Sequence, residues 1–107
     1  MSQKRIPQIE RKRDRIKEEL KRIGAMRPGS LTRQFKDPER KAGAYWQISY
    51  TRQMKSRTEY VRAEWVTELR RQIASHKRFK RLVEQWVDLS IEHSQVTMRI
   101  AKPGTTR

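Results

Sequence analysis

The sequence contains no cysteine, and this absence excludes several classes of protein. Without thiols there can be no disulfide framework, no thiolate zinc site and no cysteine nucleophile. The two histidines, His76 and His93, lie far apart in the sequence, which gives little support to a histidine-based metal centre. We therefore expect no metal, no cofactor and no catalytic residue, and we predict that the protein is not an enzyme.

Long hydrophobic runs are also missing. No apolar stretch approaches the roughly 20 residues that a membrane-spanning helix needs. The N-terminal residues Met1 to Arg5 lead into a polar helical pattern without the apolar core of a signal peptide. We expect a cytoplasmic protein with no membrane partner.

Acidic residues are scarce relative to basic ones. The 107 residues include 12 Asp and Glu against 27 Lys and Arg, so the formal net charge is +15, and the excess is spread along the whole chain. Such a charge attracts polyphosphates whether or not they are the biological partner. The composition favours a basic binding module, and DNA or RNA is the expected partner.

Two segments have helical periodicity. Near the N-terminus, isoleucine and leucine recur at alternating spacings of three and four, with Arg13 in the one vacant place, and this heptad pattern predicts a helix over residues 7–23. From residue 63 the helical period returns and predicts a longer helix over residues 63–94. Glu84, Asp88 and Glu92 form an acidic stripe on this second helix, for which the first helix is the expected basic partner.

The intervening residues 30–62 change to a pattern of strands. The clearest is 44–51, in which Trp46, Ile48 and Tyr50 alternate with more polar residues. If the chain reverses around Met54 and Lys55, residues 57–62 form the partner strand, and residues 31–35 can add a short third strand. The expected register places Ile48 opposite Val61, Ser49 opposite Tyr60 and Gln47 opposite Arg62. In this register Gln47, Ser49, Thr51, Thr58, Tyr60 and Arg62 share the face opposite Trp46 and Ile48.

These elements predict an α+β fold. We expect two long antiparallel helices, coiled-coil-like, with a two- to three-stranded antiparallel β-hairpin element inserted between them. The whole is predicted to be a single small domain over residues 1–100, followed by a flexible tail over residues 101–107. The second helix is much longer than the first, so the first helix cannot cover all of it. A homodimer in which a second copy covers the rest of the second helix is an open possibility.

The order of these elements resembles a known family. The residues that carry the likeness are Met26 to Leu31, the Tyr45-Trp46 strand with the basic strand after it, and His76 to Glu84 continuing through Leu89-Ser90. Together they resemble a family of short bacterial proteins known only as a domain of unknown function, over most of residues 8–92. Many members carry cysteines between the Gly-Ser turn and the aromatic strand, where this chain has Lys36 to Gly43. The resemblance implies the architecture and a bacterial or mobile-element source, but no activity.

The candidate site consists of cations beside flat or hydrogen-bonding side chains. A basic hairpin can contact phosphates and read base edges in the major groove, and a helix with a basic stripe can lie along a phosphate backbone. The alternatives are a solvated sheet face, and arginines that pair with the acidic residues of the first helix. The predicted nucleic-acid-binding residues are Arg33, Lys36, Gln47, Arg52, Lys55, Arg57, Tyr60, Arg62, Lys77, Arg78, Lys80 and Arg81.

The sequence thus predicts a small, basic, non-enzymatic nucleic-acid-binding protein, with DNA slightly preferred over RNA. The competing hypothesis is a coiled-coil assembly or accessory module that binds a larger protein partner, which includes a subunit of a nucleoprotein complex.

Overall fold

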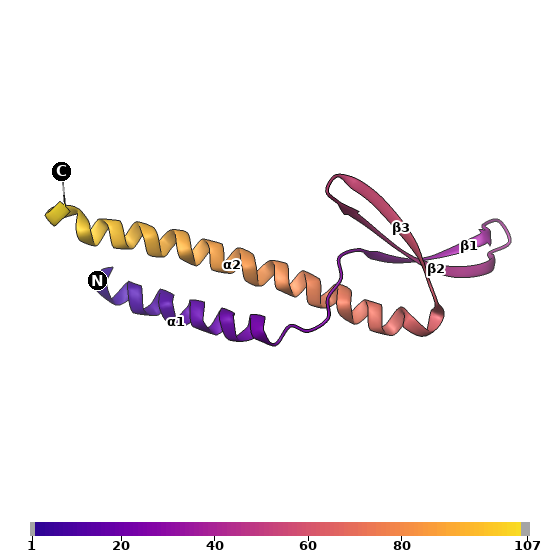
Figure 1. Ribbon diagram of the computed structural model, residues 1–107, viewed down its shortest axis with the longest axis horizontal. Coiled ribbons are helices and arrows are strands. Elements are labelled where there is room, and N and C mark those ends of the chain that lie inside the picture. Colours follow the sequence, from indigo (N-terminus) through magenta and orange to yellow (C-terminus); the bar gives the residue numbers. More distant parts are fainter. Residues whose placement is uncertain (1, 106–107) are drawn as a thin grey trace. The chain divides into compact units, whose positions relative to one another are not determined.

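The computed structural model describes residues 2–105, with side chains over residues 4–100 (Figure 1). The elements are helix α1 (Ser2–Lys21), strands β1 (Ser30–Asp37), β2 (Ala42–Arg52) and β3 (Lys55–Val61), the 3-10 helix η1 (Ala63–Trp65) and helix α2 (Val66–Thr105). The predicted α+β class, with an antiparallel sheet inserted between two helices, is therefore confirmed.

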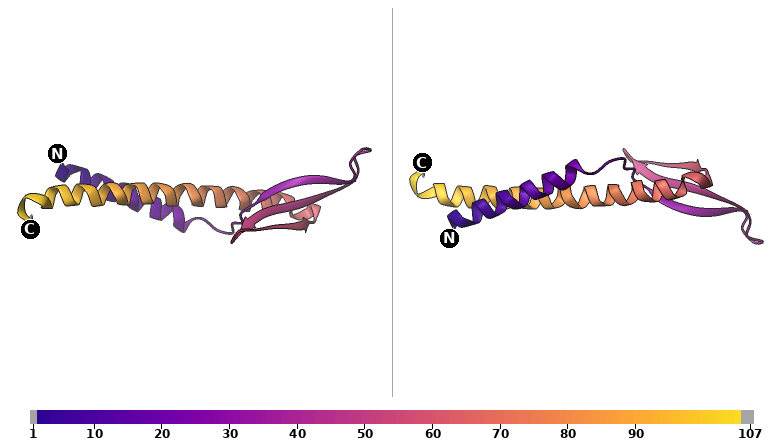
Figure 2. Two further views of the ribbon diagram at one scale, coloured as in Figure 1. Left: turned by 90° about the horizontal axis from the view of Figure 1, so that it is seen from above. Right: turned by 90° about the horizontal axis from the view of Figure 1, so that it is seen from below.

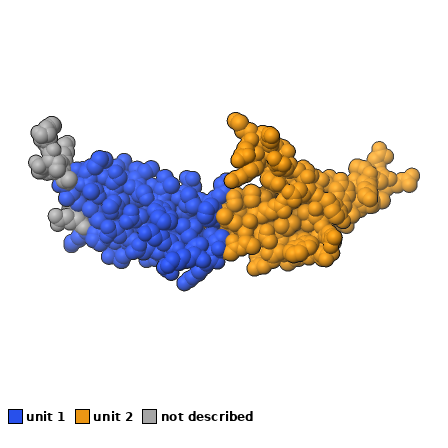
Figure 3. Space-filling model, in the orientation of Figure 1, with its two compact units in different colours: residues 1–23, 79–107 blue, residues 24–78 orange. Residues whose placement is uncertain are grey.

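The chain divides into two compact units (Figure 3). Unit 1 combines residues 1–23 with residues 79–107, and unit 2 comprises residues 24–78. Helix α2 contributes its first part to unit 2 and the rest to unit 1. Each unit has its own buried apolar side chains. The single domain over residues 1–100 stays a prediction.

The sheet of unit 2 has the strand order β1-β2-β3, with both neighbouring pairs antiparallel. The third strand predicted over residues 31–35 is present as β1, which pairs Leu31 with Ile48. The predicted β2–β3 register is wrong by two residues, because Val61 lies opposite Trp46 and Tyr60 lies opposite Gln47. A shift of two preserves the side-chain alternation, so the assignment of residues to the two faces is unaffected.

The position of the β2–β3 turn explains this difference. Gln53 and Met54 form a two-residue turn, with Arg52 paired with Lys55 across it. Both turn residues have positive φ, 52° and 66°. This is the backbone of a type I′ turn, whose twist matches that of the flanking strands. Because the sequence has no Asn-Gly or Gly-Gly at this point, the turn was expected one residue later.

One face of the sheet packs against the first turns of α2 and forms the core of unit 2. Ile48, Val61, Leu69 and Ile73 are buried there, with Leu31, Trp46 and Val66 packed against them. Ile48 is completely buried. An isoleucine buried in this way contributes about 1.5–3 kcal/mol to the stability of the fold.

In unit 1, α1 lies antiparallel to the C-terminal part of α2. The buried residues are Ile9 and Ile16 of α1 and Leu82 and Val96 of α2. Figure 2 shows that α1 crosses α2 obliquely instead of following it side by side. The predicted pair of long coiled-coil-like helices is thus not formed within the chain: α1 has 20 residues against 40 in α2, and Arg13 interrupts its apolar seam.

The helix bounds differ from those predicted. Helix α1 begins at Ser2 instead of residue 7, so Pro7 lies inside it, where its ring removes one backbone hydrogen bond. It ends at Lys21 instead of 23, where the backbone N–H groups of Arg22 and Ile23 bond carbonyls three residues back. Helix α2 begins at Val66, after η1, and continues to Thr105, past the end predicted at residue 94 and into the predicted tail. Residues 106–107 of that tail lie outside the described residues.

Candidate nucleic-acid interface

The sheet face that does not pack against α2 is the candidate interface, and we call it the outer face. Strand alternation and the observed register place twelve residues on it, none of which is buried. They are Ser30, Thr32, Gln34 and Lys36 of β1, Gly43, Tyr45, Gln47, Ser49 and Thr51 of β2, and Ser56, Thr58 and Tyr60 of β3. No acidic side chain occurs among these twelve residues, and ten of them have uncharged hydrogen-bonding side chains.

Cross-strand hydrogen bonds organise this face. The hydroxyls of Ser49 and Thr58 lie 3.3 Å apart, and those of Thr51 and Ser56 lie 3.2 Å apart. On β1, the Gln34 amide donates to the Thr32 hydroxyl at 3.2 Å. Each hydroxyl has one donor and two acceptor sites, so these bonds leave capacity for a ligand. The outer face is therefore an ordered array of donors and acceptors.

A hollow lies toward one end of the outer face. It has a volume of about 520 Å³ and is lined by Lys36, Gly43, Ala44, Tyr45 and Tyr60. Tyr60 is 70% exposed. Gly43 has a φ of +70°, and a Cβ built there would lie 3.0 Å from the Lys36 Cβ, so glycine allows the lysine stem to lie against the backbone. An ammonium group and two phenol rings thus line one open hollow.

The predicted hairpin cations do not all lie on this face. Lys36, Gln47 and Tyr60 belong to the outer face, and Arg62 follows the end of β3. Arg33, Arg52, Lys55 and Arg57 alternate to the opposite face, and the Arg33 guanidinium lies 5.5 Å from the Phe35 ring centroid. The structure therefore brings together only part of the predicted set.

Arg52, Lys55 and Arg57 gather at the β2–β3 end of the hairpin. All three are exposed, and Arg52 lies directly opposite Lys55 in the register. Neither of those two takes part in an ion pair or hydrogen bond among the described side chains. Met54, in the turn between them, is 98% exposed. We call Arg52 to Lys55 together with Arg57 the hairpin tip.

Glu59, the only acidic residue of β2 and β3, is held by two other residues. Arg27 Nη2 donates to Glu59 Oε1 at 2.6 Å, and the Tyr50 hydroxyl donates to Glu59 Oε2 at 2.9 Å. The hydrogen bond from Arg27, followed by that from Tyr50, lowers the pKa of Glu59 below its ordinary 4.5, and the same pair raises the pKa of Arg27. The negative charge of Glu59 is thereby paired with the positive charge of Arg27, so the carboxylate repels an approaching anion less.

Sequence reasoning missed this arrangement of Arg27, Tyr50 and Glu59. Arg27 precedes the sheet, and its guanidinium lies 5.3 Å from the Tyr50 ring centroid. Its backbone N–H also donates to the Gln72 carbonyl of α2 at 3.1 Å. No spacing or motif connects these residues, because their contact depends on how the segment before β1 folds back over the sheet.

The predicted helix cations are exposed along α2. Lys77 and Arg78 belong to unit 2, and Lys80 and Arg81 belong to unit 1. Lys77, Lys80 and Arg81 take part in no ion pair among the described side chains. Earlier on α2, Arg70 lies 5.2 Å from the Trp46 ring centroid, and Arg71 pairs with Glu68. These two arginines support the fold of unit 2.

The acidic stripe of α2 meets basic residues of α1 in part, as predicted. Arg5 pairs with Glu92 at 2.5 Å, and their hydrogen bond raises the pKa of Arg5 and lowers that of Glu92. Glu10 lies 3.4 Å from His93, and Lys17 Nζ lies 5.4 Å from the Trp86 ring centroid. Of the acidic residues of α1, Glu10 contacts His93 and Glu18 pairs with Lys21.

The described part of the chain contains no cluster of metal-ligating side chains. Among its side chains, no three His, Asp or Glu residues come together in a way that could hold an ion. None of the helices within residues 2–105 has the length and hydrophobicity of a membrane-spanning segment.

Comparison with known proteins places the chain in a family without assigning it an activity. No curated protein and no solved structure matches it. A family model matches residues 6–71, which include most of α1, the whole sheet and the start of α2. The prediction of a family known only as a domain of unknown function is confirmed, although this match ends before the His76 to Ser90 stretch. The chain belongs to the family described as a domain of unknown function, DUF6788.

Proposed function

We propose that this protein binds nucleic acid through the outer face of its sheet and the cations around it, without catalysing a reaction. The observation that carries the proposal is that the twelve outer-face residues include no carboxylate, in a chain with 12 acidic residues. A surface of hydroxyls, amides and phenols, with cations beside it, matches the chemistry of base edges between phosphates.

Duplex DNA is the favoured form. The major groove of B-form DNA is about 12 Å wide and admits a two-stranded β-ribbon, here β2 and β3, whose side chains then reach the base edges. Gln47 and its cross-strand neighbour Tyr60 lie on the outer face, where an amide can pair with adenine and a phenol can donate to an acceptor. Lys36 and Arg62 would contact phosphates at the borders of the outer face, and Arg57 would do so from the hairpin tip. Lys77, Lys80 and Arg81 would add phosphate contacts along α2.

The test is fluorescence anisotropy with labelled duplex DNA, single-stranded DNA and structured RNA. We compare wild type with the double variant Arg57→Glu/Arg62→Glu. Its control, Arg11→Glu/Arg22→Glu, makes the same change in net charge on exposed residues in and just after α1. We expect the hairpin variant to bind duplex DNA at least tenfold more weakly, a change of about 1.4 kcal/mol or more, and the control to lose much less.

Equal losses in the two double variants would show that binding follows net charge alone, and the proposal would be wrong. Circular dichroism of all variants checks that the fold is retained, as expected for exposed substitutions. A parallel pair, Lys80→Glu and Arg81→Glu, measures the contribution of α2. A stronger affinity for RNA than for duplex DNA at about 150 mM salt would replace DNA by RNA as the proposed ligand.

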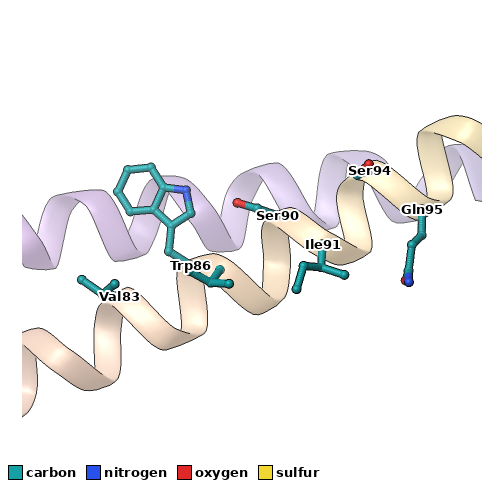
Figure 4. A pocket seen from close by; sticks show the side chains of 7 residues that line it. Val83, Trp86, Ser90, Ile91, Ser94 and Gln95 are labelled. Carbon is teal, nitrogen blue, oxygen red and sulfur yellow. The ribbon is translucent and has the colours of Figure 1, made fainter.

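Self-assembly through α2 is a second candidate function, favoured by one observation in unit 1. An apolar groove of about 570 Å³ follows α2 and is lined by Val83, Trp86, Val87, Ser90, Ile91, Ser94 and Gln95 (Figure 4). Val87 and Ile91 are 46% and 52% exposed, and Met98, one turn beyond the groove, is 62% exposed. The spacing of Val87, Ile91, Ser94 and Met98 is four, three and four, the spacing of a coiled-coil seam.

We propose a second copy of the chain as the occupant of this groove. The seam is uncharged, so two strongly basic chains can meet there without placing like charges in contact. If two copies of α2 pack antiparallel, Ile91 lies opposite Ser94 of the second copy and Val87 lies opposite Met98. Each layer then combines a larger with a smaller side chain, which is the condition for close packing.

Light scattering after size exclusion tests the assembly. We expect a dimer for wild type and a monomer for Ile91→Glu, because the substitution places a charge in the seam. Gln85→Glu adds the same charge at an exposed position away from the seam, and we expect this control to stay dimeric. A monomeric wild type at micromolar concentration would contradict the proposal, and capture experiments for a larger protein partner would then replace it.

A further inference from the structure

The β2–β3 turn carries side chains where its backbone favours glycine. Gln53 and Met54 have φ values of 52° and 66°. Left-handed φ brings the Cβ of an ordinary residue too close to its own backbone, and Asn-Gly or Gly-Gly relieves this in most turns of this type. The free protein therefore gives up stability to keep a glutamine and a methionine at this position.

Two further features of the hairpin tip are unfavourable in the free protein. Met54 is 98% exposed, so its apolar side chain buries nothing. Arg52 and Lys55 lie directly opposite each other, and like charges in that position repel. No carboxylate among the described residues pairs with either cation. Within residues 52–55, the left-handed turn, the exposed Met54 side chain and the Arg52–Lys55 pair are thus each unfavourable in the free protein.

The minor groove of duplex DNA would offset all three of these unfavourable features. The minor groove of DNA has closely spaced phosphates on both walls, which attract the two cations, and base-pair edges at its floor, between which an apolar side chain can insert. Methionine is among the side chains that minor-groove proteins insert between base steps. A lipid surface or a protein pocket could also bury Met54. Neither of them necessarily presents negative charge on both sides of the buried side chain, as the two phosphate walls of the minor groove do.

We propose that the hairpin tip enters the minor groove of duplex DNA, with Met54 wedged against a base step and Arg52 and Lys55 on opposite phosphate walls. The proposal rests on the proposed function and specifies its geometry. Five residues separate Lys55 from Tyr60, or about 17 Å at about 3.4 Å per residue. This is about half of the roughly 34 Å turn of B-DNA, so the outer face and the tip can occupy successive grooves.

The proposal is tested with the double variant Gln53→Asn/Met54→Gly, which installs the preferred turn sequence. We expect a melting temperature at least equal to that of wild type, because the strain is removed, together with duplex binding about tenfold weaker, which corresponds to about 1.4 kcal/mol. Met54→Leu, which keeps an apolar wedge, is the matched control and should bind within about twofold of wild type.

A base-stacking probe separates insertion from simple attraction. Duplexes with 2-aminopurine at successive positions should gain fluorescence where wild type or Met54→Leu unstacks a step, and the glycine variant should produce no gain. If wild type binds duplex DNA but the glycine variant binds equally well, or no position gains fluorescence, the tip does not insert and only this proposal is overturned. If wild type binds no nucleic acid, the proposed function itself fails. Binding to anionic vesicles that requires Met54, without DNA binding, would also overturn the proposal.

Discussion

Gly29, immediately before β1, has a structural role that a single substitution can test. Its φ is +139°, and a Cβ built there would lie 2.8 Å from Cγ1 of Ile48, the completely buried residue of the sheet. Gly29→Ala therefore combines backbone strain with a clash in the core. We expect a loss of about 1–3 kcal/mol in the free energy of unfolding, measured by urea denaturation.

Gly24 supplies the control for this prediction, because a Cβ built there meets nothing within 4 Å and its φ is not left-handed. We expect Gly24→Ala to change the free energy of unfolding by less than about 0.5 kcal/mol. Equal losses in the two variants would show that Gly29 has no special role.

The ion pair of Arg27 and Glu59 makes stability depend on pH. The pKa of Glu59 is lowered in the folded state by its hydrogen bonds with Arg27 and Tyr50. A group with a lowered folded pKa contributes stability above its unfolded pKa and loses it as the pH falls through the folded value. We expect the melting temperature to fall as the pH decreases below the ordinary value of 4.5.

Glu59→Gln removes the titrating group and should make this decrease smaller. Glu39→Gln is the control, because Glu39 is exposed in the β1–β2 loop and has no ion pair among the described residues. A pH profile for Glu59→Gln that superimposes on that of wild type would contradict the assignment.

At the scale of elements, helix α1 packs on α2 through only a few apolar residues of its heptad pattern. Ile9 and Ile16 are its buried residues, and Arg13 lies between them with a buried Nε that has no hydrogen-bond partner among the described residues. A helix of this length is marginal in water unless it packs on a partner. Replacing the unsatisfied group by an apolar side chain should therefore strengthen the contact between α1 and α2.

We expect Arg13→Leu to raise the free energy of unfolding by about 1 kcal/mol, because it removes an unsatisfied buried donor and completes the apolar spacing. Arg11→Leu removes the same charge at an exposed position and should leave stability nearly unchanged. Thermal unfolding followed by circular dichroism compares the two variants. A loss of stability in Arg13→Leu would show that this arginine has a role in α1 that its hydrogen bonds do not reveal.

The elements also show how far the sequence could predict the fold. Alternation in β2 and β3 correctly placed Gln47, Ser49, Thr51, Thr58 and Tyr60 on one face, because side-chain period is a local property of a strand. The register was wrong, because it depends on whether Gln53 and Met54 adopt left-handed φ, and neither residue type indicates that they do. The same turn placed Arg52 and Lys55 opposite each other at the hairpin tip.

At the scale of the whole molecule, the net charge of +15 governs how binding responds to salt. Five cations border the outer face and the hairpin tip: Lys36, Arg52, Lys55, Arg57 and Arg62. If each of these five cations and each of Lys77, Lys80 and Arg81 on α2 contacts one phosphate, the logarithm of the affinity for duplex DNA should fall with the logarithm of salt concentration at a slope of about −7. Anisotropy titrations between about 50 and 300 mM salt measure this slope.

The double variant Arg57→Glu/Arg62→Glu should reduce the magnitude of the slope by about 2, since each phosphate contact contributes about one unit. The matched reversal of Arg11 and Arg22 should leave it nearly unchanged. A slope that responds equally to both changes would indicate that cations over the whole chain contact DNA, without a defined interface.

The sequence by itself determined the order and type of the elements, the face assignment of the strands and the excess of positive charge, because periodicity and composition are local properties of the chain. Only the tertiary structure decided the register, the oblique crossing of α1 on α2 and the capture of Glu59 by Arg27, because these depend on contacts between distant residues. It also decided which side chains of β1 join the outer face, because this depends on the register between β1 and β2.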